Sequence, residues 1–391
     1  MNSSEYAKMT VLVCDDMFNM RRTIKNMLRH IGFENIVEAE NGSKAWELLN
    51  RSKVDMVISD WNMPEVPGVE LLRRVRDDAR LRDLPFVMIT AEVSESKIVQ
   101  AAETEVDGYL IKPFIAKALE DKIQTIFNNR ENPPPFERQM KNGLSFLESG
   151  AYDKAVGAFS EALRIRPDSA RARFEIGEAY ARKGDNVQAE RWNKEALNIN
   201  PQYLRAYEGL SKVYEKQGKT ADAIKLMEKA SEISPNNPRR HLEMGKLFLK
   251  TGDKEKGERA LQLAMKNAEH NADIHTEVGE VYLASGEETK AAAAFSNSIN
   301  INESVHVYNR LGIALRKKFQ YEEAFKVYLK AIKMEPENEV LFFNVGRLRM
   351  EQEMFSDAAE YFKKALVIDP EFNECKDMLK KTLEMAAGKR F

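Results

Sequence analysis

The sequence predicts a two-part protein: an α/β domain built on a doubly wound parallel sheet of five strands, followed by an all-α solenoid of helical repeats. Three observations predict this. Within residues 1–130, five short apolar runs alternate with helical stretches, as in a parallel sheet with helices on both faces. Three consecutive prolines follow, within residues 131–135. Beyond them, prolines and small residues recur at a step of 34 residues, typical of helical repeats.

The expected strands are short, apolar and bounded by polar or turn-forming residues. They run from Met9 to Cys14, Ile36 to Ala39, Met56 to Ile58 (stopping at Asp60), Leu84 to Ile89 and Asp107 to Ile111. The expected helices cover residues 17–30, 42–49, 67 or 68 to 76 and 94–103, and a last helix runs to about Asn129. Gly32 is expected to end the first helix and Ser94 to cap the fourth.

Polar residues collect where these strands end. Asp15, Asp16, Asp60, Thr90 and Lys112 stand at or just beyond the carboxyl ends of the first, third, fourth and fifth strands. The strand order 2-1-3-4-5 brings these ends to one edge, where sheets of this class bind ligands. Three carboxylates close together repel one another and invite a divalent cation with oxygen ligands, of which Mg²⁺ fits best.

The same cluster suits phosphoryl chemistry. Lys112 supplies a positive charge and Thr90 a hydroxyl for phosphoryl oxygens. A carboxylate at Asp60, next to a metal ion and a fixed ammonium, can attack phosphorus and form an acyl phosphate. No dinucleotide-binding, P-loop or serine-hydrolase motif is present. We therefore predict a phosphoacceptor site and no enzyme.

Composition limits the partners and the location. Lys and Arg total 60 and Asp and Glu total 62, so no excess of positive charge favours nucleic acid as a partner. Cys14 and Cys375 lie far apart, in unlike segments, and predict no disulfide framework. No stretch is long and apolar enough for a signal peptide or a membrane span. The expected location is the cytoplasm.

Residues 5–129 resemble a bacterial response-regulator receiver domain, and closely the single-domain chemotaxis regulator. The matching motifs are Asp15-Asp16, Met20-Arg21-Arg22, SDWNMP from Ser59, Thr90-Ala-Glu92 and GYLIKPF from Gly108. The resemblance implies a flavodoxin-like fold and a phosphoryl group transferred to Asp60 from a histidine kinase or phosphotransfer protein. One departure is Met17, where the chemotaxis protein carries an aromatic residue, and this leaves the lifetime of the phosphoryl group undecided.

The resemblance also implies roles for the neighbouring residues. Asp16, Asp60 and the backbone carbonyl of Asn62 would bind Mg²⁺, with Asp15 acting partly through water. Thr90 and Tyr109 would form a switch pair, in which the hydroxyl moves toward the phosphoryl group while the ring turns inward. The bond between Lys112 and Pro113 is expected to be cis.

Residues 136–372 resemble seven copies of the tetratricopeptide repeat. A small residue marks the same point in each copy: Gly143, Gly177, Ser211, Gly245, Gly279, Gly312 and Gly346. Residues 373–391 are expected to form a capping helix and a tail that cover the last apolar face. The linker over 131–135 is expected to be a stiff polyproline segment that holds the two parts close together.

Such arrays bind peptides or proteins in a concave groove, so the resemblance implies a protein partner. The groove is expected to include Arg205, Lys212, Arg239, Lys246, Asn309, Arg316 and Arg347. The favoured hypothesis is a two-component response regulator in which phosphorylation of Asp60 controls protein binding. Two alternatives stay open: repeats that bind nucleic acid or an RNA-processing partner, and a receiver that serves as a phosphate sink. Homodimer formation also stays open.

Overall fold

A computed structural model describes residues 3–78, 80–91 and 106–388. It divides into two compact units, Met1–Pro235 and Asn236–Phe391. The expected helix over 94–103, its cap Ser94 and the motif residue Glu92 lie outside the described residues. Within the described ranges, no helix combines the length and the apolar character needed to span a membrane.

The first unit begins with a five-stranded parallel sheet. The strands are β1 (Thr10–Cys14), β2 (Asn35–Ala39), β3 (Met56–Asp60), β4 (Phe86–Thr90) and β5 (Gly108–Ile111). Their order is β2-β1-β3-β4-β5, and each neighbouring pair is parallel, which confirms the predicted topology. Strands β1, β3 and β4 are almost wholly buried because both faces of the sheet are covered.

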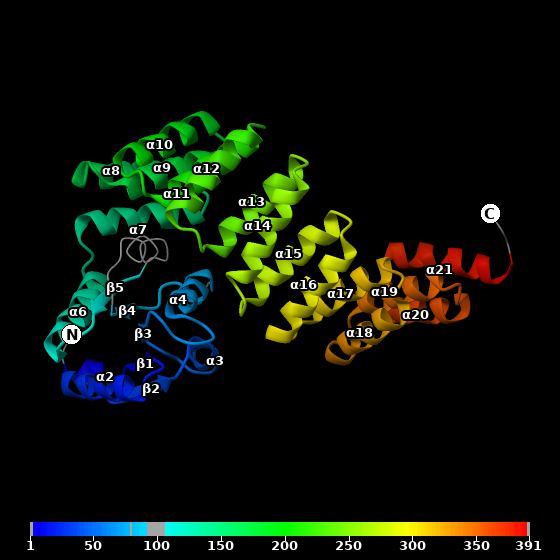
Figure 1. The fold of residues 1–391 in the computed structure, drawn as a ribbon, viewed down its shortest axis with the longest axis horizontal. Helices are drawn as coiled ribbons and strands as arrows, with labels where there is room; N and C mark the ends of the chain where they lie inside the picture. The colour runs from blue at the N-terminus through cyan, green and yellow to red at the C-terminus, as the bar shows by residue number, and fades with distance from the viewer. Residues whose placement is uncertain (1–2, 79, 92–105, 389–391) are drawn as a thin grey trace. The chain divides into compact units, whose positions relative to one another are not determined.

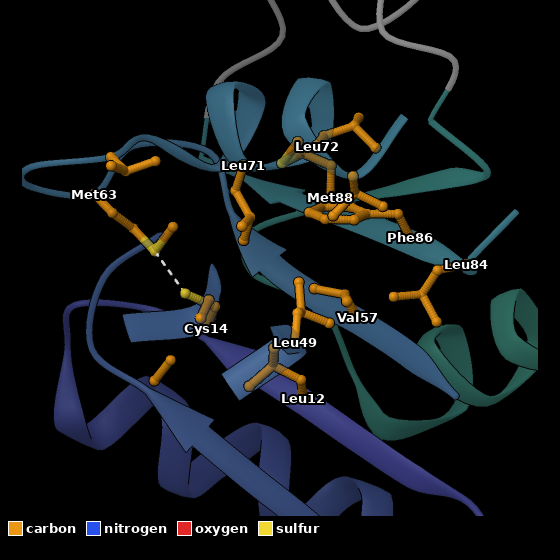
Figure 2. Close-up of a cluster of buried hydrophobic side chains, with 14 of the residues drawn as sticks. Leu12, Cys14, Leu49, Val57, Met63, Leu71, Leu72, Leu84, Phe86 and Met88 are labelled. Carbon is orange, nitrogen blue, oxygen red and sulfur yellow. Dashed lines mark hydrogen bonds between the residues drawn. The ribbon is translucent and has the colours of Figure 1, made fainter. Parts of the chain in front are cut away.

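Among the residues that the structure describes, four helices cover the two faces of the sheet (Figure 1). Helices α2 (Phe18–Ile31) and α6 (Ala116–Glu131) pack on one face. Helices α3 (Gly42–Arg51) and α4 (Gly68–Asp77) pack on the other, where Leu49, Leu71 and Leu72 meet side chains of the central strands (Figure 2). Gly32 ends α2 in the left-handed conformation, as expected.

A short helix, α1 (Ser3–Tyr6), was not predicted. Four residues give too short a pattern for a helical period to be recognised. The ring of Tyr6 stacks on Phe33, with ring centroids 4.7 Å apart, and both rings are buried. The N-terminal segment is therefore fixed by tertiary packing.

The proline segment is shorter than expected, because one of its prolines is helical. Helix α6 ends at Glu131 and α7 begins at Pro135, so three residues connect them. Proline is well tolerated at the first position of a helix, because its missing N–H would have no partner there. Pro134, with φ −50° and ψ 151°, keeps the extended conformation expected of the segment.

From Pro135 to Ile368, a range that the structure describes throughout, helices follow one another in seven pairs. The pairs are α7 (Pro135–Glu148) and α8 (Tyr152–Ile165), α9 (Ala170–Lys183) and α10 (Asn186–Ile199), α11 (Leu204–Lys216) and α12 (Thr220–Ile233), α13 (Pro238–Lys250) and α14 (Lys254–Lys266), α15 (Ala272–Ala284) and α16 (Glu288–Ile301), α17 (Val305–Lys317) and α18 (Tyr321–Met334), and α19 (Glu339–Glu351) and α20 (Phe355–Ile368). The first three pairs lie in the first unit and the last four in the second.

The small residue of each repeat lets the two helices of a pair approach closely. A Cβ atom added to Gly346 would lie 2.6 Å from the ring of Phe362, and one added to Gly312 would lie 2.4 Å from the ring of Tyr328. Such distances are far inside van der Waals contact, so glycine is needed wherever a large ring packs against the first helix. The structure thus explains the period of 34 residues by packing within each pair.

Helix α21 (Asn373–Ala386) follows the last pair and packs on α20. Its side chains Cys375 and Thr382 are fully buried, and Cys375 belongs to a core cluster with Phe343 and Phe362. This side of α21 covers apolar surface that the last pair leaves open.

Deleting residues 373–391 should therefore destabilise the second unit. The deletion exposes the apolar surface around Phe362 and Phe372, so we expect a lower melting temperature and a lower solubility. Circular dichroism during heating measures the first, and a dilution series the second. A matched deletion of residues 389–391 should change neither. An unaltered melting temperature in the longer deletion would mean that α21 does not act as a cap.

Candidate functional site

Asp60 is the last residue of β3 and lies at the carboxyl edge of the sheet. It is 7 % exposed, so little water reaches its charge. The backbone N–H of Asn62 donates to Asp60 Oδ2 at 2.9 Å. The N–H of Trp61 donates to the carbonyl of Ile89 on β4 at 2.8 Å. These bonds fix the start of the loop after β3 and hold the Asp60 carboxylate in one orientation.

Lys112 joins Asp60 to Asp15. Its Nζ atom lies 2.5 Å from Asp60 Oδ1 and 2.9 Å from Asp15 Oδ2. Asp15 follows β1, is fully buried, and also accepts the backbone N–H of Met17 at 2.9 Å. A buried carboxylate is costly without a partner, and one ammonium here serves two of them. Three strand ends, distant in sequence, thus supply one charge cluster.

Burial and ion pairing have opposite effects on the pKa of Asp60, and likewise on the pKa of Lys112. Burial raises the pKa of Asp60, and the hydrogen bond and charge of Lys112 offset that effect only in part. Burial lowers the pKa of Lys112, but its hydrogen bonds to Asp60 and Asp15 outweigh burial, so the net pKa is raised. Lys112 is therefore a fixed positive charge at neutral pH. Asp60, with a raised pKa, is more basic and more nucleophilic than a solvated carboxylate.

The remaining predicted site residues surround this contact. Thr90 ends β4 and is 7 % exposed, and its carbonyl accepts the backbone N–H of Lys112 at 2.7 Å. Tyr109 on β5 is 46 % exposed and pairs in register with Met88, two residues before Thr90. Asp16 and Asn62 are exposed. The bond between Lys112 and Pro113 is cis, as expected.

The donor set suits a hard cation. Asp15 and Asp60 present carboxylate oxygens to one positively charged atom, so the pocket already attracts positive charge. Over the ranges that the structure describes, however, no three acidic, histidine or cysteine side chains are grouped closely enough to bind one metal ion. The Lys112 ammonium pairs with both Asp15 and Asp60, while Asp16 is exposed.

Two glycines that were not predicted as site residues, Gly42 and Gly68, contact the loop between β3 and α4 closely. A Cβ atom added to Gly68 would lie 2.0 Å from the carbonyl oxygen of Asp60 and 2.8 Å from Ser59 Oγ. One added to Gly42 would lie 2.4 Å from the carbonyl oxygen of Val66. The Ser59 hydroxyl donates to the Asp60 carbonyl at 3.0 Å. The sequence offers a weak signal for Gly68, a glycine directly after Pro67 at a helix start.

Arg21 also contacts the edge of the site, although sequence analysis gave it no role beyond a motif match. Its guanidinium donates to the carbonyl of Asp15 at 2.7 Å and to that of Asp16 at 3.2 Å. These bonds fix the backbone of the acidic pair at the start of α2.

Cys14 is the last residue of β1, directly before Asp15, and is fully buried. Its thiol donates to the carbonyl of Asn41 at 3.2 Å. The thiol also contacts the Met63 sulfur at 3.4 Å (Figure 2). Burial raises the pKa of Cys14 to about 12. The thiol therefore stays protonated at neutral pH and is unreactive.

The side chains expected to line the groove of the repeats make mostly internal contacts. In the first unit, Arg205 pairs with the buried Glu175 at 3.2 Å. In the second unit, three basic side chains form ion pairs: Arg239 with Glu277, Lys246 with Glu243 and Glu277, and Arg316 with Glu351. Asn309 accepts a hydrogen bond from Asn344. Arg347 lies over the ring of Phe343. Lys212 is exposed. Most of this positive charge is therefore balanced within the array.

Comparison with known proteins identifies both parts. The response regulator receiver domain model matches residues 11–124. The chemotaxis protein CheY of Pseudomonas aeruginosa is 47% identical over 119 residues, which are 30% of this chain and 96% of that protein. CheY-3 of Vibrio cholerae is 44% identical over 119 residues (30% and 92%), and CheY1 of Helicobacter pylori is 39% identical over 124 residues (32% and 100%).

The chain belongs to the response-regulator family. Its α/β domain is a receiver domain. Tetratricopeptide repeat models match residues 140–203, 214–276 and 305–338. The predicted fusion of a receiver to tetratricopeptide repeats is thereby confirmed, and so is the predicted fold class.

The contact of Gly68 with Asp60 predicts a sensitive position. Substitution Gly68→Ala forces the backbone of Asp60 to move, and overpacking of this kind lowers the free energy of unfolding by about 1–3 kcal/mol. We expect a lower melting temperature together with slower labelling of the protein by a small acyl phosphate in the presence of Mg²⁺.

The matched control is Gly157→Ala in α8, where an added Cβ atom meets no atom within 4 Å. We expect this exposed helical position to be stabilised by about 0.5–1 kcal/mol. If Gly68→Ala melts and is labelled like the wild type, the close approach does not position Asp60.

Proposed function

We propose that this protein is a two-component response regulator that accepts a phosphoryl group on Asp60. The observation that carries the proposal is the contact of Lys112 with both Asp60 and Asp15 at the carboxyl edge of the sheet. The donor would be a phosphohistidine of a kinase or a phosphotransfer protein. Identity with the chemotaxis regulators across the receiver supports this donor class.

In the proposed reaction an oxygen of the Asp60 carboxylate attacks phosphorus. A new O–P bond forms, and the bond between phosphorus and the donor nitrogen breaks. Lys112, a fixed positive charge next to Asp60, would pair with a phosphoryl oxygen and reduce the repulsion between the two anions. The loop bonds of Trp61 and Asn62 keep the carboxylate in position for attack.

We propose that Asp15, Asp16, Asp60 and the backbone carbonyl of Asn62 bind Mg²⁺. When bound, this ion neutralises charge on the transferred group. The fit rests on the oxygen donors and on the cation that Asp15 and Asp60 already share. The exposed position of Asp16 leaves its carboxylate accessible to an ion at this edge. Thr90 and Tyr109 would respond to the phosphoryl group as a switch pair.

We further propose that the repeats bind a protein or peptide in a way that depends on phosphorylation. The balanced charges of Arg239, Lys246 and Arg316 argue against a nucleic-acid ligand, which needs basic side chains that are not already paired. They support a ligand that is recognised by shape and hydrogen bonds. A receiver that served only as a phosphate sink would not require an array of repeats.

The receiver and the first repeat are joined closely enough to communicate. Three residues separate α6 from α7, and Arg82 of the receiver lies 3.0 Å from Glu148 of α7. That ion pair is exposed and therefore contributes little stability, but it places the two surfaces in contact. A difference between the two receiver states at this contact would shift the affinity of the repeats by roughly 5- to 150-fold, the usual range of coupling energies.

Asp60→Asn should abolish phosphoryl uptake while the fold survives, because the amide keeps the shape of the side chain but is not a nucleophile. Labelling by a small acyl phosphate with Mg²⁺, followed by intact-mass measurement, detects the added phosphoryl group. Asp55→Asn, outside the cluster, is the matched control and should be labelled normally. Retained Mg²⁺-dependent labelling of the Asp60 variant would refute the assignment.

The coupling proposal predicts an effect of the connection between the domains. Replacing Pro133 and Pro134 by a long Gly/Ser segment should leave labelling of Asp60 intact, because the site lies wholly within the receiver. With the natural connection, we expect phosphorylation to change amide hydrogen exchange in α7. With the long connection, that change should disappear. An equal response in both proteins would show that the signal does not pass through this connection.

A further inference from the structure

The outer side of α21 carries an apolar groove. A hollow of about 420 Å³ is lined by Leu366 of α20 and by Lys376, Leu379, Lys380, Leu383 and Glu384 of α21. The α21 residues are three or four positions apart, so they form one stripe along the helix. Leu383 is 46 % exposed. Within the part of the chain that the structure describes, no helix follows α21 to cover this stripe.

Lys380 excludes a helix that packs on α21 as the second helix of a repeat packs on the first. Lys380 stands 34 residues after Gly346, at the point where the other repeats carry a small residue. In those repeats the second helix packs a large side chain there, and a Cβ atom on Gly346 would already lie 2.6 Å from the Phe362 ring. A lysine side chain blocks that close packing. An occupant must instead lie further out, over Leu379 and Leu383, with Lys380 at the edge of the contact.

The charges of the stripe are self-complementary. Lys376 lies near the start of α21 and Lys380 at its middle, and Glu384 lies one turn after Lys380. If a second α21 lies antiparallel with its Leu383 opposite Leu379, the Lys380 of each copy comes within about one turn of Glu384 of the other. The arrangement has a two-fold axis, so both copies use the same surface, as in most homodimers.

We propose that two copies of this chain associate through antiparallel α21 helices, burying Leu379 and Leu383 and pairing Lys380 of each copy with Glu384 of the other. A helix of 14 residues is about 21 Å long, so the contact is smaller than a standard protein interface. The association is therefore weak and depends on concentration.

Sedimentation velocity over a concentration series tests the proposal, with the full chain and without a phosphodonor or Mg²⁺. The wild type should shift from monomer to dimer as concentration rises. Leu383→Glu places a charge in the apolar stripe and should weaken dimerisation at least tenfold. Because Leu383 is half-exposed, the fold should survive. Val367→Glu is the matched control, since Val367 is 82 % exposed on α20 and does not line the groove.

A charge exchange tests the antiparallel arrangement. Lys380→Glu places a new carboxylate of one copy near Glu384 of the other, and Glu384→Lys places two lysines together, so each variant alone should dimerise roughly tenfold more weakly. An equimolar mixture of the two variants restores opposite-charge pairing between unlike copies and should dimerise like the wild type. Lys381→Glu, the same substitution at an exposed neighbour outside the groove, should have no effect.

Three outcomes would overturn the proposal. One is a wild type that stays monomeric at all concentrations, and another is a Leu383→Glu variant that dimerises normally. The third is a mixture of the charge variants that associates no better than either alone. A monomeric wild type that binds an acidic amphipathic helix, with binding lost in Leu383→Glu, would assign the groove to another partner. The Asp60→Asn variant should dimerise like the wild type, so this test is independent of phosphorylation.

Discussion

The receiver depends on one ammonium group that pairs with two buried carboxylates. Asp15 has no exposure and Asp60 very little, and removing the partner of such a charge is costly. Lys112 contacts both, which ties the loops after β1, β3 and β5 to one point. Two negative charges and one positive charge leave the cluster negative, so it attracts a further cation. On the proposed function, phosphorylation changes this balance at the same point, which suits a two-state switch.

The helical repeats depend on a different constraint, the space that small residues leave for large rings. Glycine at the repeat position admits Phe159, Phe295, Tyr328 or Phe362 from the second helix. Ion pairs then join successive repeats: Arg205 with Glu175, Arg310 with Glu280 and Arg316 with Glu351 are separated by about one repeat length. Arg205 and Arg316 belong to the side chains that were expected to line the groove, so their pairing lowers the positive charge there. Contacts that join the repeats therefore also lower the unpaired positive charge of the expected groove.

Packing also distinguishes α21 from the helices before it. Cys375 and Thr382 lie on the buried side of α21. This side packs on the last pair as the first helix of a further repeat would pack. Lys380 prevents the other side from accepting a second helix in the same way. Over the described residues, the surface of α21 that faces away from α20 is apolar but shaped unlike a repeat interface, so a contact there differs from the stacking that joins the repeats.

The sequence by itself determined the strand segments, the helix periods, the 34-residue step and the strand-end residues Asp15, Asp60, Thr90 and Lys112. These follow from local patterns: buried strands are apolar, parallel strands end at one edge, and close helices need small residues. Tertiary structure alone decided which side chains meet. The approach of Gly68 to Asp60, the stacking of Tyr6 on Phe33 and the pairing of Arg239 with Glu277 join elements whose separation no local pattern encodes.

Pro135 was placed in the linker because prolines usually break helices, but the first turn of α7 needs no N–H there. Periodicity is a property of neighbouring residues along the chain, whereas charge pairing and close approach depend on distances that exist only after folding.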